Sequence, residues 1–103
     1  MKKIVWTKTA IADLDNIHHY IAQDSLFYAD TFCLEILQTV EQLEKFPKIG
    51  RKVPEWNEDK TRELVVSDYR IVYEIHMLRI EILTVIHGAK LLKRDKLYGQ
   101  ENN

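Results

Sequence analysis

The chain has 103 residues, 46% of them hydrophobic and 30% charged, with a formal net charge of −1. These values are typical of one globular domain, and they exclude a disordered, fibrous or multidomain protein. We predict a single domain over residues 1–98 and a tail over 99–103. The opening MKKIVW has too few apolar residues for a secretory signal, and no stretch approaches the roughly 20 apolar residues of a membrane span. A cytoplasmic protein without membrane contact is expected.

The charge is distributed unevenly along the chain. Residues 9–44 contain seven acidic residues and no Lys or Arg, so the rest of the chain has a net charge of +6. Such asymmetry favours an anionic partner for the basic part. Two surfaces of opposite sign that attract each other would explain it equally well, and both interpretations stay open.

Hydrophobic periodicity predicts a strand followed by two helices. Residues 3–7 are rich in β-branched and aromatic side chains, as strands are. Apolar residues then recur at helical spacing from residue 11 to residue 21, and again from residue 29 to residue 46. Asp24-Ser25 separates the two stripes, and Pro47 ends the second. Because the linker is so short, the helices are predicted to fold back as a hairpin.

Three strands are predicted in the second half of the chain. Residues 47–60 contain both prolines and no period, and we predict a loop there. Strands follow over 62–66, 69–76 and 79–87, and the two residues after the first suit a tight hairpin. Leu64 then faces Ile71, and residues that face each other share one apolar surface for the helices to cover.

The predicted fold class is therefore α+β, in the order β-α-α-β-β-β. A helical hairpin packs on one face of an antiparallel sheet, with the first strand at an edge. Arg70 is expected on the opposite, open face. After Gly88 comes a basic segment over 90–98, which the pattern allows as a short helix.

Residues for cofactor or metal chemistry are sparse. The three glycines cannot form a nucleotide-binding loop. None of the four histidines pairs with another at i,i+4, and one cysteine can form neither an internal disulfide nor a thiolate cluster. Cys33 lies on an apolar helical stripe and is predicted to be a buried structural thiol. We expect no cofactor and no metal.

Three stretches carry a resemblance to a known family. They are ADL at residues 12–14 with the apolar positions after it, FPKIGR at 46–51 followed by VPE, and RELVVSDYRIVY at 62–73 closing with VIHG at 85–88. In this order, across residues 4–90, they resemble the RelE/ParE toxin superfamily. The resemblance implies the toxin of a type II toxin–antitoxin system, of the kind linked to plasmid stabilisation and growth arrest. Its implied partner is a cognate antitoxin. The assembly would be a toxin–antitoxin hetero-oligomer or a homodimer of the toxin.

The superfamily has two branches, and one of them cuts messenger RNA without a metal. The RelE site is made of two lysines, two arginines and a tyrosine. Thr61 and Glu63 stand where the lysines would be, Arg70 matches the first arginine, Lys90 replaces the second, and the tyrosine position falls near Lys96. Half of the set is missing, and a glutamate near a phosphate repels it, so a RelE-type mechanism is disfavoured.

A second ribonuclease type in the superfamily resembles YoeB and uses a glutamate, an arginine and a histidine. Glu55, Arg70 and His87 lie near the corresponding positions, and histidine suits acid–base work near neutral pH. His87 is interpreted equally as a strand-end residue bonded to backbone. Arg70 would hold a phosphate or an antitoxin carboxylate, or else pair across strands with Glu63 or Glu74.

The other branch, ParE, poisons DNA gyrase and is not known as a hydrolase. A chain of net charge −1 with an acidic helical hairpin is a poor match for ribosomal RNA, where phosphate contacts dominate affinity. Gyrase inhibition without enzymatic activity is therefore the primary hypothesis. A metal-independent mRNA endonuclease acting at the ribosome is the alternative, and an inactive relative that only binds a partner is the third. The candidate residues for binding nucleic acid or a partner are Arg51, Arg62, Arg70, Lys90, Lys93 and Arg94.

Overall fold

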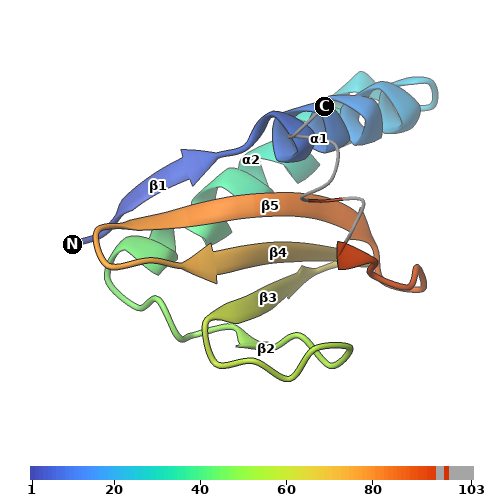
Figure 1. Cartoon of the computed structure of the whole chain (residues 1–103). Helices are drawn as coiled ribbons and strands as arrows, with labels where there is room; N and C mark the ends of the chain where they lie inside the picture. Colours follow the sequence, from blue (N-terminus) through green and yellow to red (C-terminus); the bar gives the residue numbers. More distant parts are fainter. Residues whose placement is uncertain (95–96, 98–103) are drawn as a thin grey trace.

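The computed structural model describes residues 1–94 and 97, and shows two helices lying against a five-stranded sheet (Figure 1). The predicted tail over 99–103 lies outside the described residues, as do residues 95, 96 and 98 of the predicted basic segment. No helix among the described residues is long and apolar enough to cross a membrane.

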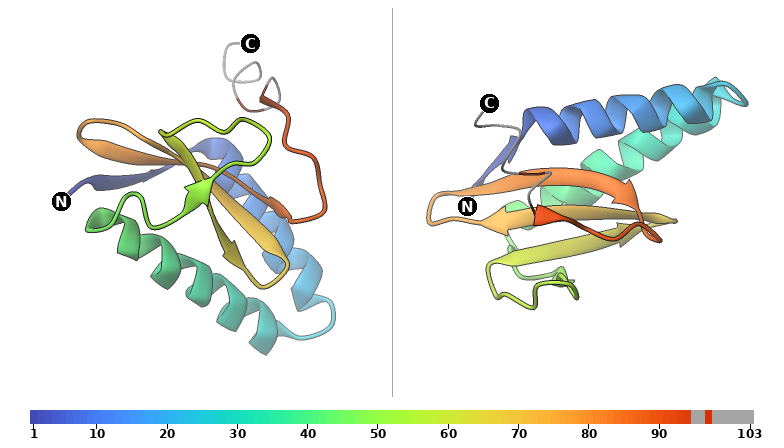
Figure 2. Two further views of the ribbon diagram at one scale, coloured as in Figure 1. Left: turned by 90° about the horizontal axis from the view of Figure 1, so that it is seen from below. Right: turned by 45° about the vertical axis from the view of Figure 1, so that its right-hand side comes forward.

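The two predicted helices are present and each begins at a hydroxyl cap. Helix α1 spans Lys8–Ala22, and the Thr7 side chain accepts a hydrogen bond from the backbone N–H of Ala10. Helix α2 spans Leu26–Glu41, and Ser25 accepts in the same way from Tyr28. Such caps satisfy backbone donors that the first helical turn leaves free. A 3₁₀ turn, Gln42–Glu44, continues α2 before Pro47. The helices pack together as the predicted hairpin (Figure 2).

The sheet has the strand order β1-β5-β4-β3-β2. Its strands are β1 Lys3–Trp6, β2 Arg51–Lys52, β3 Thr61–Val66, β4 Tyr69–Ile75 and β5 Arg79–His87. The predicted register is confirmed, with Leu64 opposite Ile71. Ser67, in the two-residue turn between β3 and β4, has a φ of 54°. Tight hairpin turns need this left-handed conformation.

Two predictions about the sheet are wrong in detail. Strand β1 lies at an edge as expected but pairs parallel with β5, so the sheet is mixed. A parallel pair needs a long crossover, and the chain between β1 and β5 supplies one. The predicted loop over 47–60 also contains β2, which pairs with Arg62 and Glu63 of β3. A strand of two residues is too short to show a period.

The main core lies between the helices and the sheet. Ile36 and Val40 of α2 meet Ile71 and Ile82 of the sheet, and all four are almost fully buried. Tyr73 is also buried, and its hydroxyl donates to the carbonyl of Pro47 at 2.7 Å while accepting from Gly50 N–H at 3.0 Å. This core fixes the sheet against the helices.

A smaller core covers the opposite face, which was expected to be open. Val72 and Leu83 of the sheet contact Val53, Leu92 and Leu97, with Trp56 and Ile86 at the margin. Val72 follows Ile71 in the chain, so strand alternation places the two cores on opposite faces. The prediction of an open face is wrong because loop 53–60 and the segment after β5 carry enough apolar residues to cover it.

Helix α1 is fastened to the edge of β5 beyond the point where β1 ends. Thr7 donates its hydroxyl to the carbonyl of Ile82 at 2.7 Å. The carboxylate of Asp13 accepts from the hydroxyl of Thr84 and from the backbone N–H of Val85. Side chains from the helix thus replace a strand partner here, which gives a structural role to the ADL stretch.

Candidate functional site

Four alternating charges form a connected chain on the sheet face opposite the helices. Arg51 of β2 contacts Glu63 of β3, Glu63 contacts Arg70 of β4, and Arg70 contacts Glu55 of the covering loop. The distances are 2.6 Å at each of these three ion pairs. Glu63 is 1% exposed and Arg70 is 6% exposed. We call Arg51, Glu63, Arg70 and Glu55 the charge chain.

Arg70 uses nearly all of its donor capacity within the protein. A guanidinium has five N–H groups. Nε donates to Glu63 at 2.8 Å, and Nη1 and Nη2 donate to the two oxygens of Glu55 at 2.8 and 2.6 Å. Nη1 also donates to the carbonyl of Lys90 at 3.2 Å, and Nη2 lies 2.6 Å from a Glu63 oxygen. A phosphate could reach Arg70 only by displacing one of these carboxylates.

Glu55 is held in its ionised form. Hydrogen bonds from Arg70 lower the pKa of the Glu55 carboxyl to about 2, opposing the rise that burial would cause, and the backbone N–H of Leu92 assists at 3.0 Å. The same contacts raise the pKa of Arg70 above its usual range, with the hydrogen bond to Glu55 as the largest cause. A carboxylate stabilised in this way is a weak proton acceptor near neutral pH.

His87 lies beside the charge chain, but its side chain contacts other residues. It is the register partner of Tyr69, and the two rings meet edge-on with centroids 5.6 Å apart. Tyr69 also contacts Phe32 of α2, so this pair faces the helices. Arg70, the next residue after Tyr69, points to the other face. His87 Nδ1 accepts from the backbone N–H of Ala89 at 3.1 Å, as the backbone-bonded interpretation predicts. The structure therefore brings Glu55 and Arg70 into direct contact, whereas His87 shares with Arg51 and Arg70 only the lining of a neighbouring shallow groove of about 280 Å³.

The other candidate basic residues are spread over the surface. Arg62 donates to Asp59 and to the carbonyl of Gly50, which fixes the start of β3. Arg94 lies 4.3 Å from the ring centre of Trp56 and forms an ion pair with Glu58. Trp56 packs against the smaller core, and the guanidinium of Arg94 covers the face of its ring. Lys90 and Lys93 are both exposed.

A shallow groove lies over the charge chain. It has a volume of about 320 Å³, and its lining includes Arg51, Glu55, Arg70, Lys90 and Leu91. Lys90 adds a positive charge beside the charge chain. The four charge-chain residues themselves sum to zero, so the groove is less positive than its arginines suggest.

Sequence reasoning identified Glu55 and Arg70 and offered Glu63 as a partner of Arg70, but it missed the burial of that pair. The predicted alternatives for Arg70 included a pair with Glu63 or Glu74 at an exposed site. The pair with Glu63 is present and buried, whereas Glu74 contacts His76. Strand alternation already places Glu63 and Arg70 on one face. Loop 53–60 helps to cover that face, and its sequence shows no periodic signal from which the cover could be predicted.

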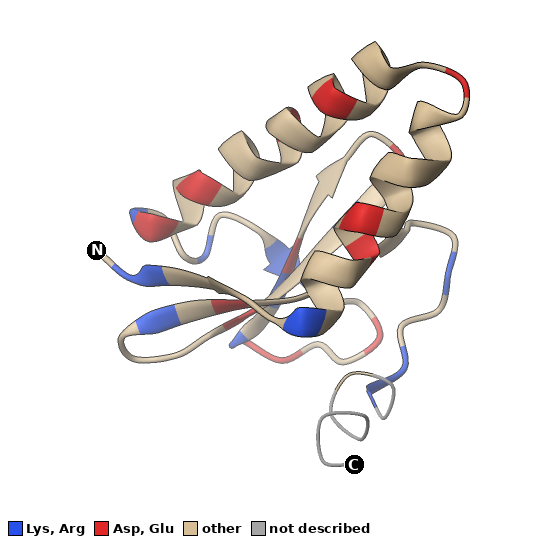
Figure 3. Cartoon of the chain, turned by 90° about the horizontal axis from the view of Figure 1, so that it is seen from above, with Lys and Arg blue, Asp and Glu red and all other residues tan. Residues whose placement is uncertain are grey.

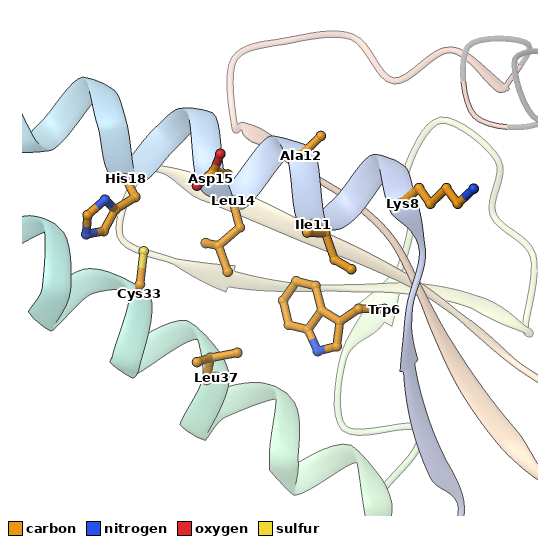
Figure 4. A pocket seen from close by; sticks show the side chains of 9 residues that line it. All are labelled: Trp6, Lys8, Ile11, Ala12, Leu14, Asp15, His18, Cys33 and Leu37. Atoms are coloured by element: carbon orange, nitrogen blue, oxygen red, sulfur yellow. The ribbon is translucent and has the colours of Figure 1, made fainter.

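A second feature is an apolar groove between the two helices (Figure 4). Trp6, Ile11, Leu14 and Leu37 line it, and its volume is about 760 Å³. Cys33 is half-buried at this groove, less buried than predicted. Burial raises the pKa of the Cys33 thiol, and the nearby Asp30 and Asp15 raise it further.

The helices that border this groove are acidic. Figure 3 shows acidic residues along both helices and basic residues on the N-terminal strand and the C-terminal segment, whereas the β4–β5 hairpin carries both signs. The acidic part of the sequence therefore corresponds to the two helices, while the rest of the chain mixes both charges. Asp15 lies at the groove, and Asp30 forms an ion pair with His18 at 2.7 Å.

Comparisons with known proteins agree on one family. The family described as the ParE toxin of the type II toxin–antitoxin system parDE matches residues 4–92. Toxin RelE2 of Caulobacter vibrioides is 34% identical over 92 residues, which cover 88% of this chain and all of that protein. Putative toxin Y4kP of Sinorhizobium fredii is 36% identical over 88 residues, covering 84% of this chain and 88% of that one.

A solved structure shares the fold. A chain of the chromosomal ParDE toxin–antitoxin system from P. aeruginosa superposes with a TM-score of 0.70 at 24% sequence identity. The match covers 84% of this chain and 96% of the other.

Proposed function

The chain belongs to the ParE toxin family of type II toxin–antitoxin systems, and we propose that it arrests growth by poisoning DNA gyrase through surface binding. The observation that carries this proposal is the engagement of Arg70 with two carboxylates and a carbonyl. A toxin that cuts RNA needs cations free to bind the phosphate. A toxin that acts by binding has no such requirement.

The groups that would serve as base and acid in RNA cleavage also favour gyrase inhibition over an endonuclease. Metal-free cleavage requires a base to remove the proton of the 2′-hydroxyl and an acid for the leaving oxygen. Glu55, with a pKa of about 2, is a poor base, and His87, although it lines a groove with Arg70, packs its ring against Tyr69. The acidic helices add repulsion against ribosomal RNA.

One observation favours the mRNA endonuclease as the second candidate. Glu55 and Arg70, two of its three proposed catalytic residues, do meet, and Lys90 lies at the groove above them. An RNA that displaced Glu55 from Arg70 would free both groups at once. This function therefore remains the alternative for the same surface.

Two assays on the purified full-length chain and one growth test in cells separate these functions. We expect inhibition of gyrase supercoiling with cleaved DNA accumulating, intact messenger RNA in a translating extract, and undiminished growth arrest by His87→Ala. Cut transcripts with unaffected gyrase, and loss of cutting in His87→Ala, would establish the endonuclease. If expression of the chain alone caused no growth arrest, the remaining hypothesis would be an inactive relative that only binds a partner.

As a family member the chain has an antitoxin partner, and we propose that part of the antitoxin binds the groove between the helices. The groove is apolar inside and carries both Lys8 and Asp15 at its margin, so it fits a segment with apolar anchors flanked by side chains of either charge. Ile11 and Leu37, which are 55% and 44% exposed, offer the contact area.

Ile11→Asp should weaken binding of the antitoxin encoded beside this gene, measured by calorimetry. Leu26→Asp is the matched control, because Leu26 is 61% exposed and is not among the groove-lining residues. Equal affinity in both variants would place the antitoxin elsewhere on the toxin.

A further inference from the structure

We propose that Glu74, His76 and Glu81 form a binding site for a divalent transition-metal ion of the zinc class. These residues lie where β4 turns into β5, away from the charge chain and from the helical groove. Within the described residues they are the one group of three metal-ligating side chains whose ligand atoms all lie within 4.8 Å of one another. The inference is independent of the proposed function.

The spacing of the donor atoms suits an ion. His76 Nε2 lies 3.0 Å from Glu74 Oε1 and 3.1 Å from Glu81 Oε1. An ion bonded to nitrogen and oxygen at about 2.0–2.2 Å holds neighbouring ligand atoms roughly 3–3.5 Å apart. The three atoms can therefore ligate one ion with small adjustments of the side chains.

The donor set indicates the class of ion. Imidazole suits zinc and its neighbours in the first transition row, whereas magnesium and calcium prefer oxygen donors alone. Three protein ligands leave a fourth tetrahedral position for water. The side chains of His76 and Glu81 are 29% and 25% exposed, so an ion can enter from solvent.

The surrounding contacts hold the ligands in place. Glu74 and Glu81 are register partners in adjacent strands, and Arg79 Nε donates to Glu81 Oε2 at 2.9 Å, which leaves Oε1 directed at His76. The His76 backbone donates to the Arg79 carbonyl, and Lys2 Nζ donates to the His76 carbonyl at 2.6 Å. Such outer contacts orient ligands in metal sites and strengthen binding.

A buried hydroxyl beside the cluster is a second, independent observation. Thr61 is the register partner of Glu74, so both side chains lie on the same face of the sheet. Thr61 is fully buried, and its Oγ1 has no hydrogen-bond partner among the described residues. Buried polar atoms rarely stay unpaired in native proteins. A carboxylate or a water drawn towards an ion would give this hydroxyl its partner.

This metal site was not predicted from the sequence. The expectation of no metal rested on the absence of histidine pairs at helical spacing and of cysteine pairs. Glu74, His76 and Glu81 come together across two strands of a hairpin. Their separation along the chain matches none of the zinc motifs considered there.

The test is a titration of tag-free, chelator-treated full-length protein with ZnCl₂. We expect calorimetry to show one ion per chain, and the melting temperature to rise by about 5–10 °C at ten times the dissociation constant. Cobalt in place of zinc should give visible absorption bands of a four- or five-coordinate site. Magnesium at the same concentrations should produce no such rise.

Variants assign the binding to these residues. His76→Ala should abolish zinc binding, and Glu81→Gln should weaken it at least tenfold. His18→Ala is the matched control, because His18 pairs with a single carboxylate, and it should bind zinc as the natural sequence does. Circular dichroism verifies that each variant folds. No zinc binding by the natural sequence, or equal binding by Glu81→Gln, would overturn the proposal.

Discussion

The two faces of the sheet are stabilised in different ways. The face under the helices is apolar, and its residues follow the periods of two helices and three strands. The opposite face combines a small apolar cluster with the charge chain, whose two central members, Glu63 and Arg70, are buried. Apolar packing tolerates small changes in shape, whereas a buried ion pair loses much of its value when one member is removed. The second face is therefore the more sensitive to single substitutions.

The largest expected effect is that of Arg70→Ala. The change removes one of the two arginines that pair with the buried Glu63 and leaves only the exposed Arg51, so we expect a loss of about 3–5 kcal/mol in the free energy of unfolding. Urea denaturation measures it. The triple variant Arg70→Met, Glu63→Leu, Glu55→Leu should recover most of that loss, because apolar residues of similar volume often replace buried ion pairs without cost. A loss below about 1 kcal/mol for Arg70→Ala would show that the two faces are equally tolerant.

Low pH should also destabilise the protein through the face that carries the charge chain. The pKa of Glu55 is about 2 in the folded chain against about 4.5 for a free glutamate, so its stabilising contribution is complete above pH 4.5 and disappears as the pH falls towards 2. Glu55→Gln lacks this titration. The difference in unfolding free energy between the natural sequence and Glu55→Gln should therefore shrink by about 2 kcal/mol between pH 7 and pH 3. A constant difference would mean that Glu55 is not held by Arg70 in solution.

The smallest effect is expected on the helix-covered face. Ile36 is fully buried in the main core, and Ile36→Val removes one methylene group. We expect a loss of about 0.5–1.5 kcal/mol in urea denaturation. A loss as large as that of Arg70→Ala would contradict the contrast between the faces.

The same contrast explains what sequence reasoning could and could not reach. The helical stripes and the strand alternation are local signals, so the hairpin, the main core and the pairing of Leu64 with Ile71 were predictable. The cover of the second face comes from Val53 and Leu92, which lie in segments without a period. Because that cover decides the burial of Arg70, its pairing with Glu55 could not be read from spacing.

The parallel pairing of β1 was also beyond local signals. Residues 3–6 show only that a strand forms, and its partner, β5, begins more than 70 residues later. The position of His87 was predictable in part. Once Tyr69 is placed on the helix side, the register puts its partner His87 there too.

The fastening of α1 by Asp13 also bears on self-association. Exposed strand edges with free backbone groups promote sheet growth between molecules, and native proteins protect them. The β5 edge past Ile82 is capped by Thr7 and Asp13, which occupy backbone groups that a foreign strand would need. On the other side β2 covers β3 only at Arg62 and Glu63. Strand addition to the folded chain should therefore use the uncovered end of β3 or the outer edge of β1, and Asp13→Ala would open a further place at β5.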